Sequence, residues 1–200
     1  DMVHSILMDV TNEQDVKRAV SKSINSFGGI DILVANAGFA SAALFEKTSS
    51  KLWDKNMDIL SKGCFLISRE VYQKMIDQKN GGSIIFVSSK NSLNASKGAS
   101  AYSVAKSSLL HLSRSIALEG SSHKIRSNVV YPDAVIQNSK IWQGEWTKQR
   151  AISNKISVNQ VEEFYKNRSL LKVSILPEDI AEGIYFFASS KSKKSTGNII

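Results

Sequence analysis

Short apolar runs of strand length alternate with longer segments in which apolar residues recur at helical spacing. This alternation constrains the fold of the 200-residue chain more than any other feature. The runs at residues 3–10, 30–35, 83–87 and 126–131 are expected to be strands. The last three are too apolar for a sheet with one wet face, so they need cover on both faces, as parallel strands do. The sequence therefore predicts an α/β domain with a doubly wound parallel sheet.

The segments between these runs are predicted to be helices. Thr11 and Gln14 fit a capping box that begins the first helix. A long helical region is expected over residues 51–78, and a further helix ends at Gly120. Pro177 fits the first position of a final helix, where acidic residues follow it.

The stretch at residues 137–172 is polar, contains tryptophan and has weaker periodicity, so we interpret it as an inserted helical lid over a substrate site. The whole chain, residues 1–200, is then one dinucleotide-binding domain with this insertion. Its N-terminal glycine-rich βαβ part is expected to be missing.

Composition excludes several other classes of protein. The net charge of +8 comes from scattered basic residues with no interleaved aromatics, which argues against nucleic-acid binding. The longest uncharged stretch, residues 32–45, is shorter than the roughly 20 apolar residues of a membrane span. Cys64 is the only cysteine and no export signal is present, so we expect a cytoplasmic protein. We also expect no metal site.

Ligands of a doubly wound sheet bind at the carboxyl ends of its strands, so the residues that follow each strand are the first candidates for a site. The small residues Asn36, Ala37 and Gly38 would let the backbone approach a nucleotide closely. The full set at the strand ends is Asp9, Val10, Thr11, Asn36, Ala37, Gly38, Ser88, Ser89, Pro132, Asp133, Ala134 and Val135.

Tyr102 and Lys106 are four residues apart on a predicted helix, which places both side chains on one face. A tyrosine with its ordinary pKa near 10 is a poor base at neutral pH, but an adjacent ammonium favours the ionised form. Ser89 could hydrogen-bond a substrate oxygen beside Tyr102. The arrangement suits interconversion of a carbonyl and an alcohol. Each motif alone is common, and only their joint placement at successive strand ends is informative.

These residues give the chain a resemblance to the short-chain dehydrogenase/reductase family, which has a Rossmann-type fold. The motifs that carry it are Asp9-Val10, Asn36-Ala37-Gly38, Ser89, Tyr102-Ser103-Val104-Ala105-Lys106, Pro132 to Val135 and Pro177-Glu178-Asp179. The resemblance implies that Tyr102 is the acid/base and that Lys106 also holds the nicotinamide ribose. It further implies that Asp9 and Val10 contact the adenine, that residues 36–38 line the cofactor channel, and that the Val135 backbone binds the carboxamide beside Pro132.

The C-terminal third is similar to the dehydrogenase module of bifunctional rhamnulose-1-phosphate aldolase/alcohol dehydrogenases. The similarity lies in residues 132–136, Ile141-Trp142 and residues 171–179. It implies lactaldehyde, from rhamnose breakdown, as substrate and an aldolase domain fused upstream. The wider family implies a homodimer or homotetramer. Two alternatives stay open: a polyol or sugar-alcohol dehydrogenase, and a catalytically silent nucleotide-binding module.

Three departures from the family pattern stand out. The glycine-rich phosphate loop is absent, so NAD is the expected cofactor but NADP stays open. Leu60 occupies the position of the family's usual asparagine, and Asn56 lies one helical turn earlier. Asp133 replaces the glycine that commonly follows Pro132.

Overall fold

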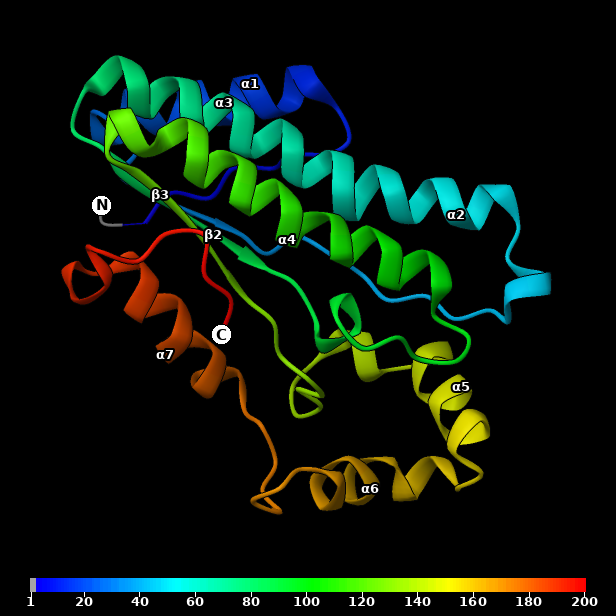
Figure 1. Ribbon diagram of the computed structural model, residues 1–200. Coiled ribbons are helices and arrows are strands. Elements are labelled where there is room, and N and C mark those ends of the chain that lie inside the picture. Colours follow the sequence, from blue (N-terminus) through cyan, green and yellow to red (C-terminus); the bar gives the residue numbers. More distant parts are fainter. Residues whose placement is uncertain (1–2) are drawn as a thin grey trace.

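A parallel three-stranded sheet lies at the centre of the computed structural model, which describes residues 3–200. Its strands are β1 (Ile32–Ala35), β2 (Gly82–Val87) and β3 (Ile125–Val130), in that spatial order (Figure 1). The C-terminal segment continues the pairing beyond β3, because Val129 donates its backbone N–H to Asn198 and accepts one from Ile200, at 2.9 and 3.0 Å. The expected parallel α/β architecture is confirmed.

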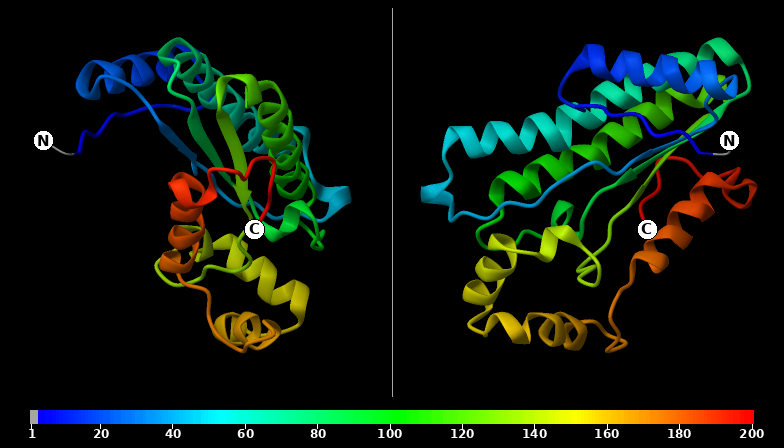
Figure 2. Two further views of the ribbon diagram at one scale, coloured as in Figure 1. Left: turned by 60° about the vertical axis from the view of Figure 1, so that its left-hand side comes forward. Right: turned by 180° about the vertical axis from the view of Figure 1, so that it is seen from behind.

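Helices cover both faces of the sheet, with α1, α3 and α4 on one side and α7 on the other (Figures 1 and 2). Alternate residues of β2 point into the two cores. Ile84 and Phe86 pack in the core on the α3 and α4 side, and Ile85 packs against Phe187 of α7. All three β2 side chains are fully buried. Cover on both faces explains why this strand is apolar at nearly every position.

Residues 3–10 form no strand, so that prediction is wrong. A strand needs a neighbour that takes up its backbone N–H and C=O groups, and no described segment pairs with this one. The Leu7 carbonyl accepts instead from the Arg18 guanidinium, at 2.9 Å.

The first helix, α1 (Glu13–Phe27), begins one residue later than the capping box predicted. Its N-cap is Asn12, whose side chain accepts from the backbone N–H groups of Gln14 and Asp15. The Thr11 hydroxyl donates to the Asp9 carboxylate at 2.8 Å instead. A side chain already committed to a preceding turn cannot cap the helix that follows.

The helical region predicted for residues 51–78 is present but not uniform. It consists of α2 (Ser50–Asn56), a π-helical turn (Met57–Lys62) and α3 (Gly63–Gln78). π turns within α-helices are frequent at functional sites. The turn carries the fully buried Leu60, whose side chain points toward Gly38 at the end of β1.

The segment at residues 137–172 contains the helices α5 (Glu145–Asn154) and α6 (Val161–Arg168). They lie together below the sheet, apart from α1, α3 and α4 (Figure 2). A short parallel bridge between Val135 and Ile175 joins the two ends of this insertion. The last helix, α7 (Pro177–Ala188), begins at the predicted proline.

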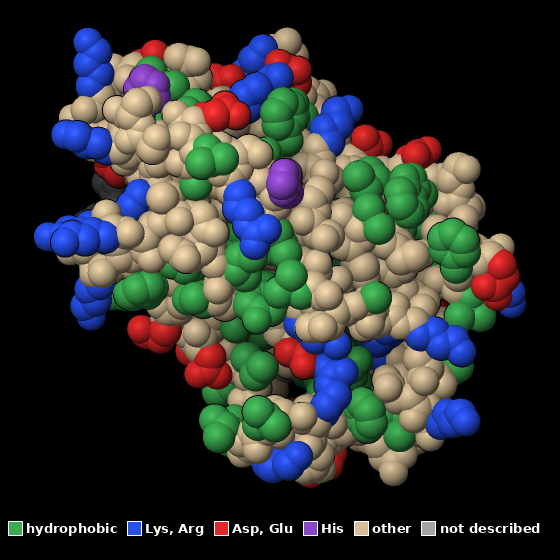
Figure 3. Space-filling view, viewed as in Figure 1, with side chains coloured by type: hydrophobic (Ala, Val, Ile, Leu, Met, Phe, Trp, Pro, Cys, Tyr) green, Lys and Arg blue, Asp and Glu red, His purple; other side chains and the backbone are tan. Residues whose placement is uncertain are grey.

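No helix within residues 3–200 is long and apolar enough to cross a membrane. Figure 3 shows Lys and Arg side chains scattered over the viewed face and gathered into no continuous stripe.

Candidate active site

A cavity of about 490 Å³ lies at the carboxyl ends of the strands, between the sheet and the α5, α6 and α7 segments. Nine of the residues predicted for a site line it: Asn36, Gly38, Ser88, Ser89, Tyr102, Lys106, Pro132, Asp133 and Val135. The geometry therefore brings together residues that are as much as 99 positions apart in the chain, from Asn36 to Val135.

Lys106 is held in place by the end of β2. The helix α4 (Ser100–Gly120) carries both Tyr102 and Lys106, and the Ser88 hydroxyl donates to the Lys106 backbone carbonyl at 2.9 Å. The Lys106 Nζ donates to the carbonyl oxygen of Val87 at 2.7 Å. Burial lowers the pKa of Lys106 to about 8, opposed by the nearby Cys64.

Tyr102 is buried beside Ser89. Burial raises the pKa of Tyr102, and a hydrogen bond with Ser89 opposes the rise. Desolvation of the phenolate dominates the direction of this shift. The Ser89 oxygen accepts from the Asn91 backbone N–H at 3.2 Å, which leaves its own O–H able to donate into the cavity.

Asn56, the asparagine nearest the family's usual position, makes its hydrogen bonds with groups other than Lys106. Asn56 is fully buried, and its amide donates to the Leu52 carbonyl at 2.7 Å and to the Ser41 hydroxyl at 2.8 Å. Leu60 instead fills the space beside the lysine. A Cβ on Gly38 would lie 3.2 Å from Leu60 Cδ2 and 3.8 Å from Lys106 Nζ.

These residues fit a nicotinamide nucleotide, which the family of the resemblance uses. The Lys106 ammonium has three N–H donors and uses one on Val87, so it retains two for ribose hydroxyls. Asn36 and Gly38, which follow β1, line the same cavity as Lys106. In the part of the chain that the structure describes, no group of three or more His, Cys, Asp or Glu side chains could hold a metal ion.

Three of the expected cofactor contacts lie outside the cavity lining. Ala37 is exposed and does not line it, although both of its neighbours Asn36 and Gly38 do. Asp9 and Val10 lie in the turn before α1, where the Asp9 carboxylate accepts from the backbone and the hydroxyl of Thr11. Val10 contacts the start of α3, with its Cγ2 2.9 Å from the place of a Cβ on Gly63.

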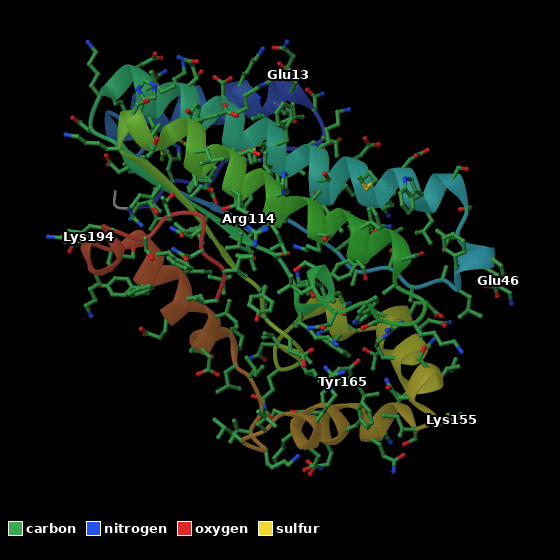
Figure 4. The ribbon with its side chains drawn as sticks, in the orientation of Figure 1. Glu13, Glu46, Arg114, Lys155, Tyr165 and Lys194 are labelled. Atoms are coloured by element: carbon green, nitrogen blue, oxygen red, sulfur yellow. The ribbon has the colours of Figure 1, made fainter. Side chains whose placement is uncertain are left out.

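Sequence reasoning missed a group of aromatic and cationic side chains where α5 and α6 line the cavity. Trp146 packs on Tyr102 with ring centroids 5.4 Å apart, and the Arg150 guanidinium lies 4.6 Å from the Trp146 ring. Trp142 contacts both Trp146 and Tyr165. In Figure 4 the Tyr165 side chain lies between α6 and the rest of the domain. Trp146 and Arg150 are four residues apart on α5, and this spacing was a signal for one helix face, whereas Trp142 lies in the turn before that helix.

Fold and cavity together define a Rossmann-type α/β protein with a Ser–Tyr–Lys site at the strand ends. A family model described as enoyl-(acyl carrier protein) reductase matches residues 2–200. The Bacillus subtilis uncharacterized oxidoreductase YuxG is 50% identical over 196 residues, which are 98% of this chain and 28% of YuxG. The chain therefore spans little more than a quarter of that relative.

Solved structures agree with the family match. Sorbitol-6-phosphate 2-dehydrogenase SrlD from Erwinia amylovora superposes with a TM-score of 0.91 at 29% identity, covering 96% of this chain and 75% of SrlD. Ligand-free aldohexose dehydrogenase from Thermoplasma acidophilum gives a TM-score of 0.88 at 25% identity, covering 100% and 76%. The chain belongs to the short-chain dehydrogenase/reductase family, whose members are NAD(P)-dependent oxidoreductases.

Proposed function

We propose that this chain interconverts a hydroxyl and a carbonyl group of a small hydroxy-aldehyde or alcohol, with NAD as the expected cofactor and NADP open. The observation that carries the proposal is the meeting of Ser89, Tyr102 and Lys106 in one cavity. A bound nicotinamide nucleotide supplies the hydride acceptor or donor. The chain's own residues bind the substrate, polarise it and move its proton.

Tyr102 is the acid/base of the proposed reaction. Its raised pKa keeps the hydroxyl protonated, so it can donate a proton to a carbonyl oxygen during reduction. In the oxidative direction the same oxygen must take up the substrate's hydroxyl proton, and the positive charge of Lys106 on the same helix face favours the phenolate that does so. The Ser89 O–H donates to the reacting oxygen and stabilises the charge that develops there.

The proton reaches Tyr102 by a short path in this proposal. The Asn56 amide already donates hydrogen bonds to Leu52 and Ser41. Leu60, beside Lys106, has no polar side-chain atom. Ser89 is then the group of this chain that exchanges the proton with Tyr102, and Lys106 would hold the nucleotide's ribose beside them.

Lactaldehyde is the first substrate to assay, because the C-terminal third resembles the dehydrogenase module of the bifunctional aldolase/dehydrogenases. An aldolase domain upstream belongs to the same proposal. It is supported by the large part of YuxG that lies outside the match. Polyols and sugar alcohols are the second candidate, favoured by the likeness to the sorbitol-6-phosphate and aldohexose dehydrogenases.

The test is nucleotide turnover by the full-length protein. We expect nicotinamide absorbance to change with lactaldehyde or a polyol and with NAD more than with NADP. The Ser89→Ala variant should lose most of this turnover while its nucleotide affinity stays the same. Nucleotide binding without turnover of any hydroxylated substrate would identify a catalytically silent module and refute the proposal.

A further inference from the structure

The cavity is lined by more cationic than anionic side chains. Apart from the catalytic Lys106, three cationic side chains line it, Lys90, Arg150 and Arg168, against a single carboxylate, Asp133. Arg168 pairs with Asp133, at 2.7 Å from one carboxylate oxygen. Basic and acidic side chains are visible together over this region, between α6 and α7 (Figure 3).

Arg150 is the most informative member of this group, because its side chain is buried and one of its N–H donors has no hydrogen-bond partner in the described part of the chain. Only 4% of the residue is exposed. One terminal nitrogen donates to the Lys97 carbonyl at 2.7 Å, and the face of the guanidinium stacks on Trp146. Within residues 3–200 the buried Nε has no hydrogen-bond partner. A buried charged group with an unused donor is costly unless a ligand completes it.

Lys90 is the second uncompensated cation. It directly follows Ser89, and its own side chain lines the cavity. It forms no ion pair with any residue between 3 and 200. Burial lowers the pKa of Lys90, with further lowering by Arg168 and Arg150 and an opposing effect of Asp133. The cations thus repel one another across the same space.

The position of this charge relative to Tyr102 defines what can bind there. Trp146 contacts both the Tyr102 ring and the Arg150 guanidinium, at 5.4 and 4.6 Å, so the guanidinium lies within about 10 Å of the Tyr102 ring. A short hydroxylated carbon chain can bridge that distance. One end then meets Ser89 and Tyr102, and the other end meets the cations.

We propose that Arg150 and Lys90 bind a phosphate monoester at the far end of the substrate, so that the enzyme acts on a phosphorylated polyol or hydroxy-carbonyl compound. This inference rests on the proposed function and, between its two candidates, favours the polyol type over lactaldehyde, which carries no phosphate. Three cations against one carboxylate leave two positive charges, which match a phosphate of charge −1.5 to −2 near neutral pH. Arginine's planar donors suit phosphate oxygens, and the charged hydrogen bonds are stronger than neutral ones.

The kinetic test compares sorbitol 6-phosphate with sorbitol in the full-length protein. We expect kcat/KM to be at least tenfold higher for the phosphate ester. The Arg150→Met variant should erase most of that preference, a loss of about 10- to 100-fold, through KM and with little change in kcat. Arg150→Lys should restore part of it, and Lys148→Met, a change of an exposed lysine on the same helix, should have no effect.

A binding test keeps the inference separate from turnover. Inorganic phosphate added to the nucleotide-free protein should change the tryptophan fluorescence, because Trp146 lies against Arg150. Phosphate should also compete with substrate and not with the nucleotide. Phosphate binding without turnover of any substrate would support the anion site and refute the oxidoreductase proposal.

Three results would overturn the phosphate site. The first is equal use of sorbitol and its phosphate, and the second is a preference for a hydroxy acid, which would assign the cations to a carboxylate. The third is unchanged phosphate binding in both Arg150→Met and Lys90→Met. The second of these variants guards against misfolding of the first, since Lys90 is only half-buried.

Discussion

Lys106 Nζ donates a 2.7 Å hydrogen bond to the backbone carbonyl of Val87, the last residue of β2. The bond fixes the ammonium at the carboxyl edge of the sheet, four residues along the helix from Tyr102. Burial of this charge lowers the free energy of unfolding. Burial lowers the Lys106 pKa from 10.5 to about 8, a difference worth about 3 kcal/mol.

Lys106 therefore predicts a pH dependence of stability. Between pH 8 and 10.5 the unfolded chain binds the lysine proton and the folded chain has lost it, so the free energy of unfolding rises as the pH rises through this window. We expect denaturant unfolding of the full-length protein to show this rise relative to Lys106→Met. The control Lys148→Met should keep it. Parallel pH curves for wild type and Lys106→Met would contradict the burial of the charge.

Tyr102→Phe should abolish most turnover. The change removes one hydroxyl and leaves the ring packed against Trp146, so the fold should persist. General acid/base groups contribute about 10²- to 10⁴-fold, and a loss of kcat in this range is expected. Steady-state kinetics with circular dichroism as a folding check would measure it. The exposed Tyr185→Phe serves as control, and wild-type kcat in Tyr102→Phe would remove this residue from the mechanism.

Asn56→Ala should affect stability more than catalysis. The amide makes two buried hydrogen bonds, to Leu52 and Ser41, so its loss should cost about 1–3 kcal/mol. We expect kcat to change by less than a few-fold, because these contacts leave no amide hydrogen for a proton path. A drop in kcat of about a hundredfold with unchanged stability would show that Asn56 is part of the proton path.

The outer faces of α3 and α4 predict self-association. Phe65 on α3 and Val104 and Leu118 on α4 expose 40%, 45% and 79% of their surface. Apolar side chains on neighbouring helices are typical of subunit contacts, and symmetric dimers are the commonest oligomers. Light scattering of the full-length protein should give the mass of a dimer or tetramer.

A charge within that surface should weaken the assembly. Leu118→Glu is expected to lower the average mass at micromolar concentration. Leu170→Glu, at a still more exposed leucine after α6, should not. A monomer mass for the wild-type protein would refute this interface.

Local signals in the sequence predicted most of the helices and the cluster of Ser89, Tyr102 and Lys106. The i and i+4 spacing of Tyr102 and Lys106 depends only on helix geometry, so the helix that carries them was predictable. Ser89 could be expected beside them because the ends of parallel strands share one edge. Residues 3–10 had the composition of a strand, but strand pairing depends on a neighbour that sequence pattern does not reveal.

Other features depended on burial and could not be predicted from spacing alone. The direction of the Tyr102 pKa shift follows from how much of the phenol is desolvated, which outweighs the hydrogen bond with Ser89. The sequence alone could not show whether Asn56 belongs to a proton path, because that depends on its hydrogen bonds with Leu52 and Ser41. Trp146 and Arg150 have the spacing of one helix face, but the spacing does not show whether that face points into the cavity.

The π turn at Met57–Lys62 also decides where this segment can vary in length. A π turn holds one residue more than the α-helical turn that it replaces. Deleting one residue there would restore a regular helix and leave the side chains from Gly63 onward on nearly the same faces, so Cys64, Leu66 and Val71 would stay in the core that they now fill. A deletion within α3 itself would instead rotate every later side chain by about 100°, the angle per residue of an α-helix. Natural changes in length by one residue are therefore expected at the π turn and not inside α3.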